Sequence, residues 1–261
     1  EGDEDRRTRV VDEMQASFQS DPAQVLDDSV GAPDENQSID LLAGLRIRTP
    51  EISRSGFYVS RRGEVLTTID ATQECDRITL DDDVEAEVRA VNAETGLALL
   101  SPSARLAPRQ HATFREGVPR LGSDAALSGH SYDGQLGAPS LTYGTLAAMS
   151  GLDGDETVRR YAMSVRPGDS GGPVFDRSGT VLGMLTAPEE GARTLPDGVA
   201  FGADVETIAT FLDQAGVEPR SALPGETLAR GLLERRGRLA VDRLLQLLRE
   251  QGEARRQERR Q

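Results

Sequence analysis

The sequence is poor in residues that bind metals or form crosslinks. Cys75 is its single cysteine, so neither an intrachain disulfide nor a cysteine-based metal site is possible. Its two histidines, His111 and His130, have no cysteines beside them and do not make a convincing zinc site. We therefore expect no metal and no cofactor, and we interpret Cys75 as a small buried hydrophobic residue.

The chain also lacks tryptophan, lysine and any long apolar run. Without a run of about 18 apolar residues, we expect a protein that does not span a membrane. All 30 basic residues are arginine, against 44 acidic ones, which gives a formal net charge of −14. Because contacts to phosphate require a basic surface, this balance argues against nucleic acid as a partner.

The composition changes twice along the chain. Residues 1–44 are polar, with Val11, Met14 and Phe18 at helical spacing inside a helix predicted over residues 8–19. Over residues 45–216, short apolar runs such as GFYVS, GEVLTT and GTVLGML alternate with Gly, Asp and Pro. This pattern is typical of an all-β sandwich or barrel.

Residues 217–261 form a third segment that is rich in arginine. Residues 220–261 hold eleven arginines and six acidic residues, a net charge of +5, which leaves −19 for residues 1–219. The segment is therefore expected to pack on the acidic body, to contact a partner in an assembly, or to end as a solvated helix. Its spacing predicts an amphipathic helix with one apolar face made of Leu228, Leu232, Leu239, Leu245 and Leu248.

The most specific motif is RPGDSGGPV over residues 166–174, followed by FDRSGTVLGML. A nucleophilic serine in a peptide hydrolase needs backbone N–H groups aimed at the developing oxyanion, and glycines let the loop turn tightly enough to present them. We predict Ser170 at the nucleophile position, with the N–H groups of Gly168 and Ser170 as the oxyanion donors. Asp169 is interpreted as an acid that stabilises the turn through hydrogen bonds.

Four stretches, in order, resemble the trypsin-like peptidases of the chymotrypsin fold, in particular the bacterial HtrA-like ones. They are SGFYVSRRGEVLTT, AEVRAVNAETGLALL, the nucleophile block and GVAFGADV, which together cover about residues 52–212. The resemblance implies an all-β fold of two antiparallel six-stranded barrels, over residues 45–115 and 117–212, with helices flanking them at both ends. It also implies that GVAFGADV is the substrate-side strand, so that a peptide would bind at Val199, Ala200, Phe201 and Gly202.

The sequence departs from the family pattern at two catalytic positions. Asp70 stands where the family has its general-base histidine, and Gly96 stands where the family has its orienting aspartate. His111 and His130 come after the acidic position, so neither fits the chain order of the family's triad. Because an ionised carboxylate is a much weaker base than imidazole, Ser170 lacks the neighbour that would activate it.

We therefore expect a catalytically inactive serine protease homologue that acts as a peptide- or protein-binding module or as a structural subunit of an assembly. A strand edge beside the cleft between the barrels would pair with an extended peptide. The alternatives are an active serine endopeptidase that uses Ser170 with an unorthodox base, and an architectural protein whose tail does the binding. The start at Glu1 rather than Met, together with the resemblance, predicts an extracytoplasmic location in the bacterial periplasm.

Overall fold

The computed structural model describes residues 8, 10–12, 52–73, 77–81, 84–186 and 196–247, with the backbone alone for 153 and 238–247. The chain divides into two compact units, Glu1–Arg48 and Thr49–Gln261. In the first unit, residues 8 and 10–12 are helical, which agrees with the start of the helix predicted over 8–19. Met14 and Phe18 lie outside the described residues.

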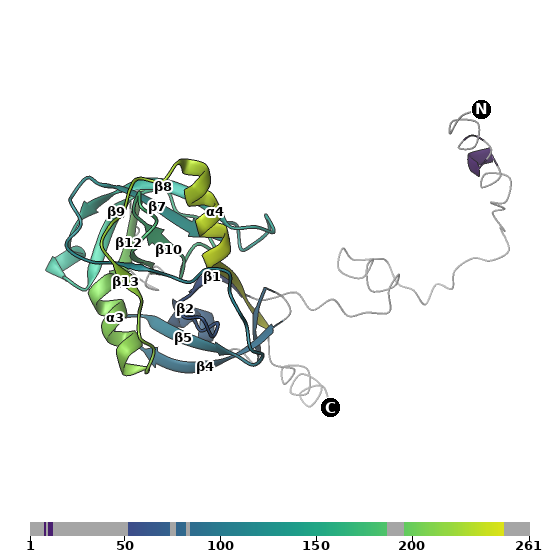
Figure 1. Ribbon diagram of the computed structural model, residues 1–261, viewed down its shortest axis with the longest axis horizontal. Coiled ribbons are helices and arrows are strands. Elements are labelled where there is room, and N and C mark those ends of the chain that lie inside the picture. The colour runs from purple at the N-terminus through teal and green to yellow at the C-terminus, as the bar shows by residue number, and fades with distance from the viewer. Residues whose placement is uncertain are drawn as a thin grey trace, which may run out of the picture. The chain divides into compact units, whose positions relative to one another are not determined.

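The second unit begins with a closed barrel of short antiparallel strands (Figure 1). Their order around the barrel is β1-β14-β3-β4-β5-β2. The short 3-10 helix η2 (Ile69–Thr72) follows the second strand and lies at one end of the barrel. The strands are β1 (Ile52–Tyr58), β2 (Val65–Thr68), β3 (Arg77–Leu80), β4 (Val84–Asn92), β5 (Leu97–Pro102) and β14 (Val241–Leu247).

The second sheet curls beside this barrel in the order β10-β7-β8-β9-β12-β11-β6-β13. An additional pairing joins β10 to β11, which are the first and sixth strands in this order. These six strands therefore curl into a ring. The prediction of an all-β, chymotrypsin-like double barrel is thus confirmed. The strands are β6 (Phe114–Arg115), β7 (Asp124–Gly129), β8 (Ser140–Ala148), β9 (Val158–Ala162), β10 (Pro173–Phe175), β11 (Val181–Leu185), β12 (Val199–Asp204) and β13 (Ser221–Ala222), with the 3-10 helix η3 (Leu152–Gly154) after β8.

One hydrophobic cluster joins the two barrels. Phe57 and Leu99 from the first barrel pack in the same buried cluster as Phe114 and Met184 from the second. The rings of Phe57 and Phe114 meet with their centroids 6.3 Å apart. Burying each such side chain contributes about 1.5–3 kcal/mol, so this contact holds the barrels together. It also explains why LALL on β5 is buried on both faces, since Leu100 points into the first barrel's own cluster.

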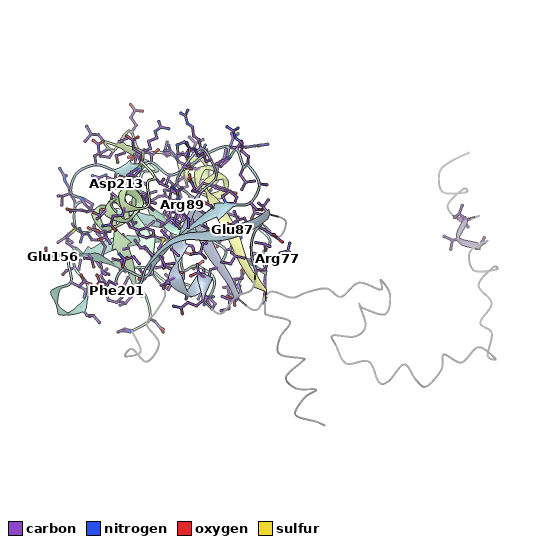
Figure 2. All side chains as sticks on the ribbon, turned by 90° about the horizontal axis from the view of Figure 1, so that it is seen from below. Arg77, Glu87, Arg89, Glu156, Phe201 and Asp213 are labelled. Carbon is purple, nitrogen blue, oxygen red and sulfur yellow. The ribbon has the colours of Figure 1, made fainter. Side chains whose placement is uncertain are left out.

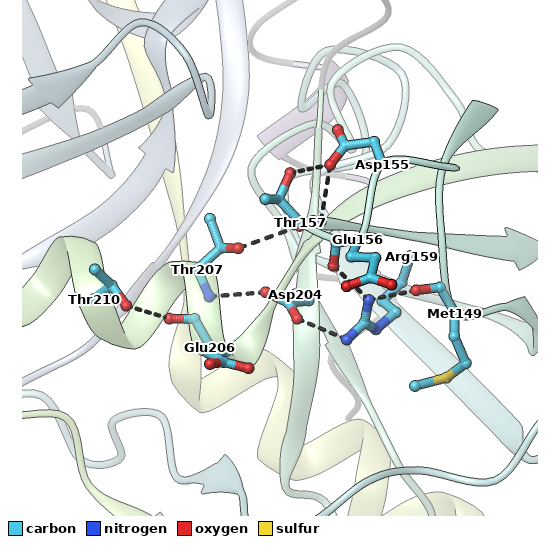
Figure 3. A network of polar contacts seen from close by, with 9 residues as sticks. All are labelled: Met149, Asp155, Glu156, Thr157, Arg159, Asp204, Glu206, Thr207 and Thr210. Atoms are coloured by element: carbon cyan, nitrogen blue, oxygen red, sulfur yellow. Dashed lines mark hydrogen bonds and ion pairs between the residues drawn. The ribbon is translucent and has the colours of Figure 1, made fainter. Parts of the chain in front are cut away.

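Helix α3 (Val205–Gln214) begins where β12 ends. Asp204 caps the helix by accepting from Thr207 N at 2.7 Å, and its other oxygen accepts from Arg159 Nη2 at 2.7 Å (Figure 3). At the far end of the helix, Arg89 Nη2 on β4 donates to Ala215 O at 2.8 Å. Figure 2 labels Arg89 on β4 and Asp213 on α3. The helix is therefore tied to both barrels.

The C-terminal segment differs from the helix predicted over 217–261. The chain forms α4 (Arg230–Ala240), which contacts β7 and β8, and then enters the first barrel as β14 (Figure 1). The segment thus supplies β13 and β14 to the two sheets, and α4 packs against the second sheet, in place of one separate helical tail. The sequence VDRLLQL satisfies a helical pattern, but between β1 and β3 its backbone finds hydrogen-bond partners on both sides, and such pairing overrides local propensity.

The apolar face predicted for this segment is correct only in part. Leu228 packs against the cluster that joins the barrels, but Leu232 is 55% exposed. The buried residues of α4 are instead Leu233 and Gly237, one turn apart. The side chains of Leu239 and Leu245, and the whole of Leu248, lie outside the described residues.

Candidate active site

The loop between β9 and β10 has the tight turn that its glycines predict. Gly168 and Gly171 adopt φ angles of +87° and +85°, which side-chain-bearing residues rarely adopt. A Cβ on Gly168 would lie 2.3 Å from His130 O, and one on Gly171 would lie 2.0 Å from Ser55 O. Glycine is therefore required at both positions by conformation and by close packing.

Asp169 is buried inside this turn. Its Oδ1 accepts from Ser131 Oγ at 2.7 Å, and its Oδ2 accepts from Arg166 N at 2.8 Å. The prediction that Asp169 stabilises the loop is confirmed by these contacts. Burial raises the pKa of the Asp169 carboxyl above its ordinary value, against the opposing effect of the hydrogen bonds from Ser131 and Arg166.

The oxyanion donors predicted from the sequence have no internal acceptor in the described part of the chain. Backbone N–H groups of Asp169, Gly171 and Gly172 all donate to carbonyls of the protein, whereas those of Gly168 and Ser170 do not. Ser170 is half-buried, and among the described residues none forms a hydrogen bond with its Oγ. Two N–H groups beside a serine hydroxyl can therefore receive a carbonyl oxygen.

Ser55 on β1 connects this loop to the first barrel. Its N–H donates to Ser170 O at 3.0 Å, and its Oγ donates to Gly168 O at 2.7 Å. The same Oγ accepts from His130 N at 2.8 Å, and Thr67 Oγ1 donates to Ser55 O at 2.9 Å. Sequence reasoning missed Ser55, whose only signal was a small polar residue at the start of the first hairpin.

Asp70, which we predict at the position of the family's base, lies on η2. Its Oδ2 accepts from Arg54 Nε at 2.7 Å, so the carboxylate is paired with a cation from β1. Arg54 Nη1 lies 3.9 Å from Asp133 Oδ1, in the loop after β7. Within the described residues, no hydrogen bond joins Asp70 to Ser170. General-base catalysis by Asp70 would need its carboxylate within hydrogen-bond reach of Ser170 Oγ.

Gly96, which we predict at the position of the family's orienting aspartate, lies directly beside η2. Its carbonyl oxygen accepts from Ile69 N at 2.9 Å. A Cβ added to Gly96 would meet no atom within 4 Å, so the position has room for a side chain and carries none. Its φ of +68° is the left-handed conformation, which aspartate tolerates better than most residues.

The two histidines lie in different surroundings. His130 is buried and adjoins the nucleophile loop through its backbone, although no hydrogen bond is found between its ring and Ser170 in the described part of the chain. His111 lies between β5 and β6, where burial, and then Arg220 and Arg61, lower its pKa. Neither is placed as a general base for Ser170.

The strand predicted to bind a peptide, Val199 to Gly202, lies inside the sheet rather than at an edge. β12 pairs with β9 from Val199↔Ala162 to Ala203↔Val158. On its other side, Phe201 O accepts from Thr186 N at 3.0 Å. The expected free edge is therefore absent at Phe201 and Gly202, whose backbone groups pair on both sides, whereas peptide binding at Val199 and Ala200, which pair with β9, stays a prediction.

The strand that does adjoin the nucleophile loop is β11. Leu185 N donates to Gly172 O and Leu185 O accepts from Gly171 N, both at 2.9 Å.

The described residues contain no group of three or more His, Cys, Asp or Glu side chains able to hold a metal ion. None of the described helices is long and apolar enough to cross a membrane.

Comparison with known proteins also indicates a trypsin-like peptidase domain. The trypsin-like peptidase domain matches residues 54–184, just over half of the chain. The "Probable periplasmic serine endoprotease DegP-like" of Brucella suis is 30% identical over 176 residues, which cover 63% of this chain and 33% of that protein. "Protease Do-like 1, chloroplastic" of Arabidopsis thaliana is 27% identical over 190 residues, or 64% of this chain and 40% of that protein.

The fold is also found among solved structures. The crystal structure of the serine endoprotease from Yersinia pestis superposes with a TM-score of 0.51 at 18% identity, over 71% of this chain and 68% of that one. The chain thus spans only a third to two fifths of the length of these two curated relatives. With the domain match, the double barrel and the Ser170 loop in agreement, the chain belongs to the trypsin-like peptidase family.

Proposed function

We propose that the protein is a catalytically inactive member of this family, which binds an extended peptide or a protein in place of cleaving it. The observation that carries the proposal is the ion pair of Asp70 with Arg54, 2.7 Å apart, at the position of the missing base. In a measured hydrolase, loss of the triad's base lowers turnover by on the order of a million-fold. The oxyanion hole and substrate binding alone leave about 10³- to 10⁴-fold over water.

The binding surface we propose is the nucleophile loop itself. The N–H groups of Gly168 and Ser170 are available to a peptide carbonyl, whereas β12 is paired on both sides. Ser55 and Asp169 hold this loop rigid, so the donors need no rearrangement when a ligand arrives. A preformed pair of donors without a base suits binding better than turnover.

An active endopeptidase with an unorthodox base is the second candidate. It is favoured by the intact nucleophile loop, in which the N–H groups of Gly168 and Ser170 have no acceptor among the described residues. The second candidate hydrolyses peptides in a reaction that requires Ser170, whereas the first has no turnover that depends on Ser170. The proposal includes a location in the periplasm, in line with the name of the Brucella suis relative. It also includes contact with an assembly through residues 217–261.

The test combines binding with hydrolysis. Fluorescein-labelled unfolded casein is titrated with the protein, with Ser170→Ala and with Gly168→Ala, while release of fluorescent fragments is followed. We expect binding by the protein and by Ser170→Ala, and loss of binding in Gly168→Ala, whose Cβ would displace the loop from His130 O. Turnover above about 0.1 s⁻¹ that disappears in Ser170→Ala would reject the proposal, since active enzymes commonly reach 1–10³ s⁻¹.

A further inference from the structure

One strand of the first barrel comes from the far end of the chain. β14 lies between β1 and β3, paired with β1 at six positions from Ile52↔Gln246 to Phe57↔Val241, and with β3 at four positions. In the described part of the chain, β1 and β3 do not pair with each other. Without β14, both strands would present unpaired backbone groups, which form a template for another strand.

The helix before this strand is held by the other barrel. Gly237 sits so close to β7 that a Cβ would lie 2.7 Å from Ser128 Oγ, and Leu233 is buried in the cluster that joins the barrels. Arg236 Nη1 donates to Ser178 O at 3.0 Å, and the guanidinium of Arg230 lies 4.9 Å from the ring centroid of Tyr143. The segment from α4 to β14 is thus anchored at two separate places.

Between these two anchors the chain has no loop. α4 ends at Ala240 and β14 starts at Val241, so a helix passes directly into a strand on a different barrel. Short connections of this kind favour the exchange of an element between copies, because the extended form relieves the tight junction. No described strand or helix follows β14, so its withdrawal displaces no other described element.

We propose that the slot between β1 and β3 is a strand-exchange site, and that it takes β14 from a second copy of this chain. A second copy fits because its β14 has the same sequence and can adopt the same register against β1 and β3. Each α4 stays on its own second barrel, each β14 enters the other copy's first barrel, and every pairing of the monomer is remade. Reciprocal exchange therefore has a low free-energy cost.

Strand exchange also affects the candidate active site, because two of its residues lie opposite β14. In the register of β1, Arg54 lies opposite Leu244 and Ser55 lies opposite Arg243. Arg54 pairs with Asp70, and Ser55 holds Gly168 and Ser170. In the exchanged dimer, the strand of one copy supports the peptide-binding loop of the other. This inference does not depend on whether Ser170 is inert.

The test uses disulfides between different chains. Ser53 and Leu245 are directly opposite in the β1–β14 register, and residues in such positions are close enough for a disulfide. One chain carries Ser53→Cys and the other Leu245→Cys, both with Cys75→Ser to remove the native thiol. The folded proteins are mixed over a range of concentrations, oxidised, and separated without reductant.

We expect a covalent heterodimer whose yield rises with concentration, and light scattering should show a dimer of the unmodified protein. A single chain with both Ser53→Cys and Leu245→Cys checks the pairing, and should form its disulfide within one chain at high dilution. The collision control mixes Glu87→Cys with Ser101→Cys chains, which are opposite on β4 and β5 and should not crosslink. Absence of the heterodimer, absence of the single-chain disulfide, or equal crosslinking in the control would overturn the proposal.

Discussion

Arg54 Nε lies 2.7 Å from Oδ2 of Asp70, the residue that we predict in the place of the family's general base. The same guanidinium lies 3.9 Å from Asp133, in a loop of the second sheet. One cation from β1 therefore pairs with Asp70 and also reaches across to the other barrel. The predictions that follow test this arrangement and its supports.

A double-mutant cycle measures the Arg54–Asp70 pair. Because the two side chains are 25% and 29% exposed, we expect a coupling free energy of about 0.5–1 kcal/mol, which decreases as salt is added. The variants are Arg54→Met, Asp70→Asn and the combination, compared by urea unfolding. Coupling indistinguishable from zero at low salt would show that the pair does not hold Asp70.

Gly171→Ala is expected to be strongly destabilising, because its Cβ would lie 2.0 Å from Ser55 O. Gly137 has a similar positive φ, +67°, but nothing within 4 Å of an added Cβ, and provides the matched control. The unfavourable φ alone costs about 1–2 kcal/mol in the control. We expect Gly171→Ala to cost at least about 2 kcal/mol more in denaturant unfolding, in line with other overpacked sites. Equal losses would mean that the contact with Ser55 is not tight.

Asp169→Asn tests the buried carboxyl of the nucleophile loop. Burial raises the pKa of Asp169 in the folded chain above the ordinary 3.8. At pH values between the unfolded and the folded pKa, the folded chain therefore retains a proton that the unfolded chain has lost. Its contribution to stability is full below the unfolded pKa and is lost as the pH rises through the folded pKa. The difference in free energy of unfolding, protein minus Asp169→Asn, should fall as pH rises above about 3.8. A difference that rises over the same range would contradict the raised pKa.

Two glycines of α4 give opposite predictions. Gly231 has open space around an added Cβ, so Gly231→Ala should stabilise the protein by about 0.5–1 kcal/mol through helix propensity. Gly237→Ala should instead destabilise it, because the added Cβ would lie 2.7 Å from Ser128 Oγ. Thermal unfolding of both variants checks the docking of α4. If Gly237→Ala is as stable as Gly231→Ala, the helix does not sit on β7.

The nucleophile loop was predictable from the sequence because its constraints are local. Gly168 and Gly171 take positive φ angles in the turn, and one oxygen of Asp169 accepts from Arg166 N three residues away, although its other oxygen accepts from the distant Ser131. The positions of Asp70 and Gly96 followed from their place in short strand-associated motifs, and the hydrogen bond from Ile69 N to Gly96 O joins the two segments. Such features need little knowledge of the rest of the fold.

Features that depend on which distant strands meet were not predictable in the same way. The repeat in VDRLLQL fits a helical face, and only pairing with β1 and β3 decides that it is a strand. The resemblance implied that β12 is the substrate-side strand, but its pairing with both β9 and β11 places it inside the sheet. Ser55 matters because β1 passes beside Ser170, a contact between residues 115 positions apart that no local pattern indicates.

Labelling of Ser170 by a fluorophosphonate probe is the most direct test of the central claim, because such probes react with activated serines only. The protein is compared with Ser170→Ala and with Asp70→His/Gly96→Asp, which supplies the base and its orienting carboxylate where Gly96 leaves space. The account predicts that the unmodified protein labels no faster than Ser170→Ala, and that the restored pair labels faster than both. Labelling of the unmodified protein that is lost in Ser170→Ala would show an activated serine and contradict the account.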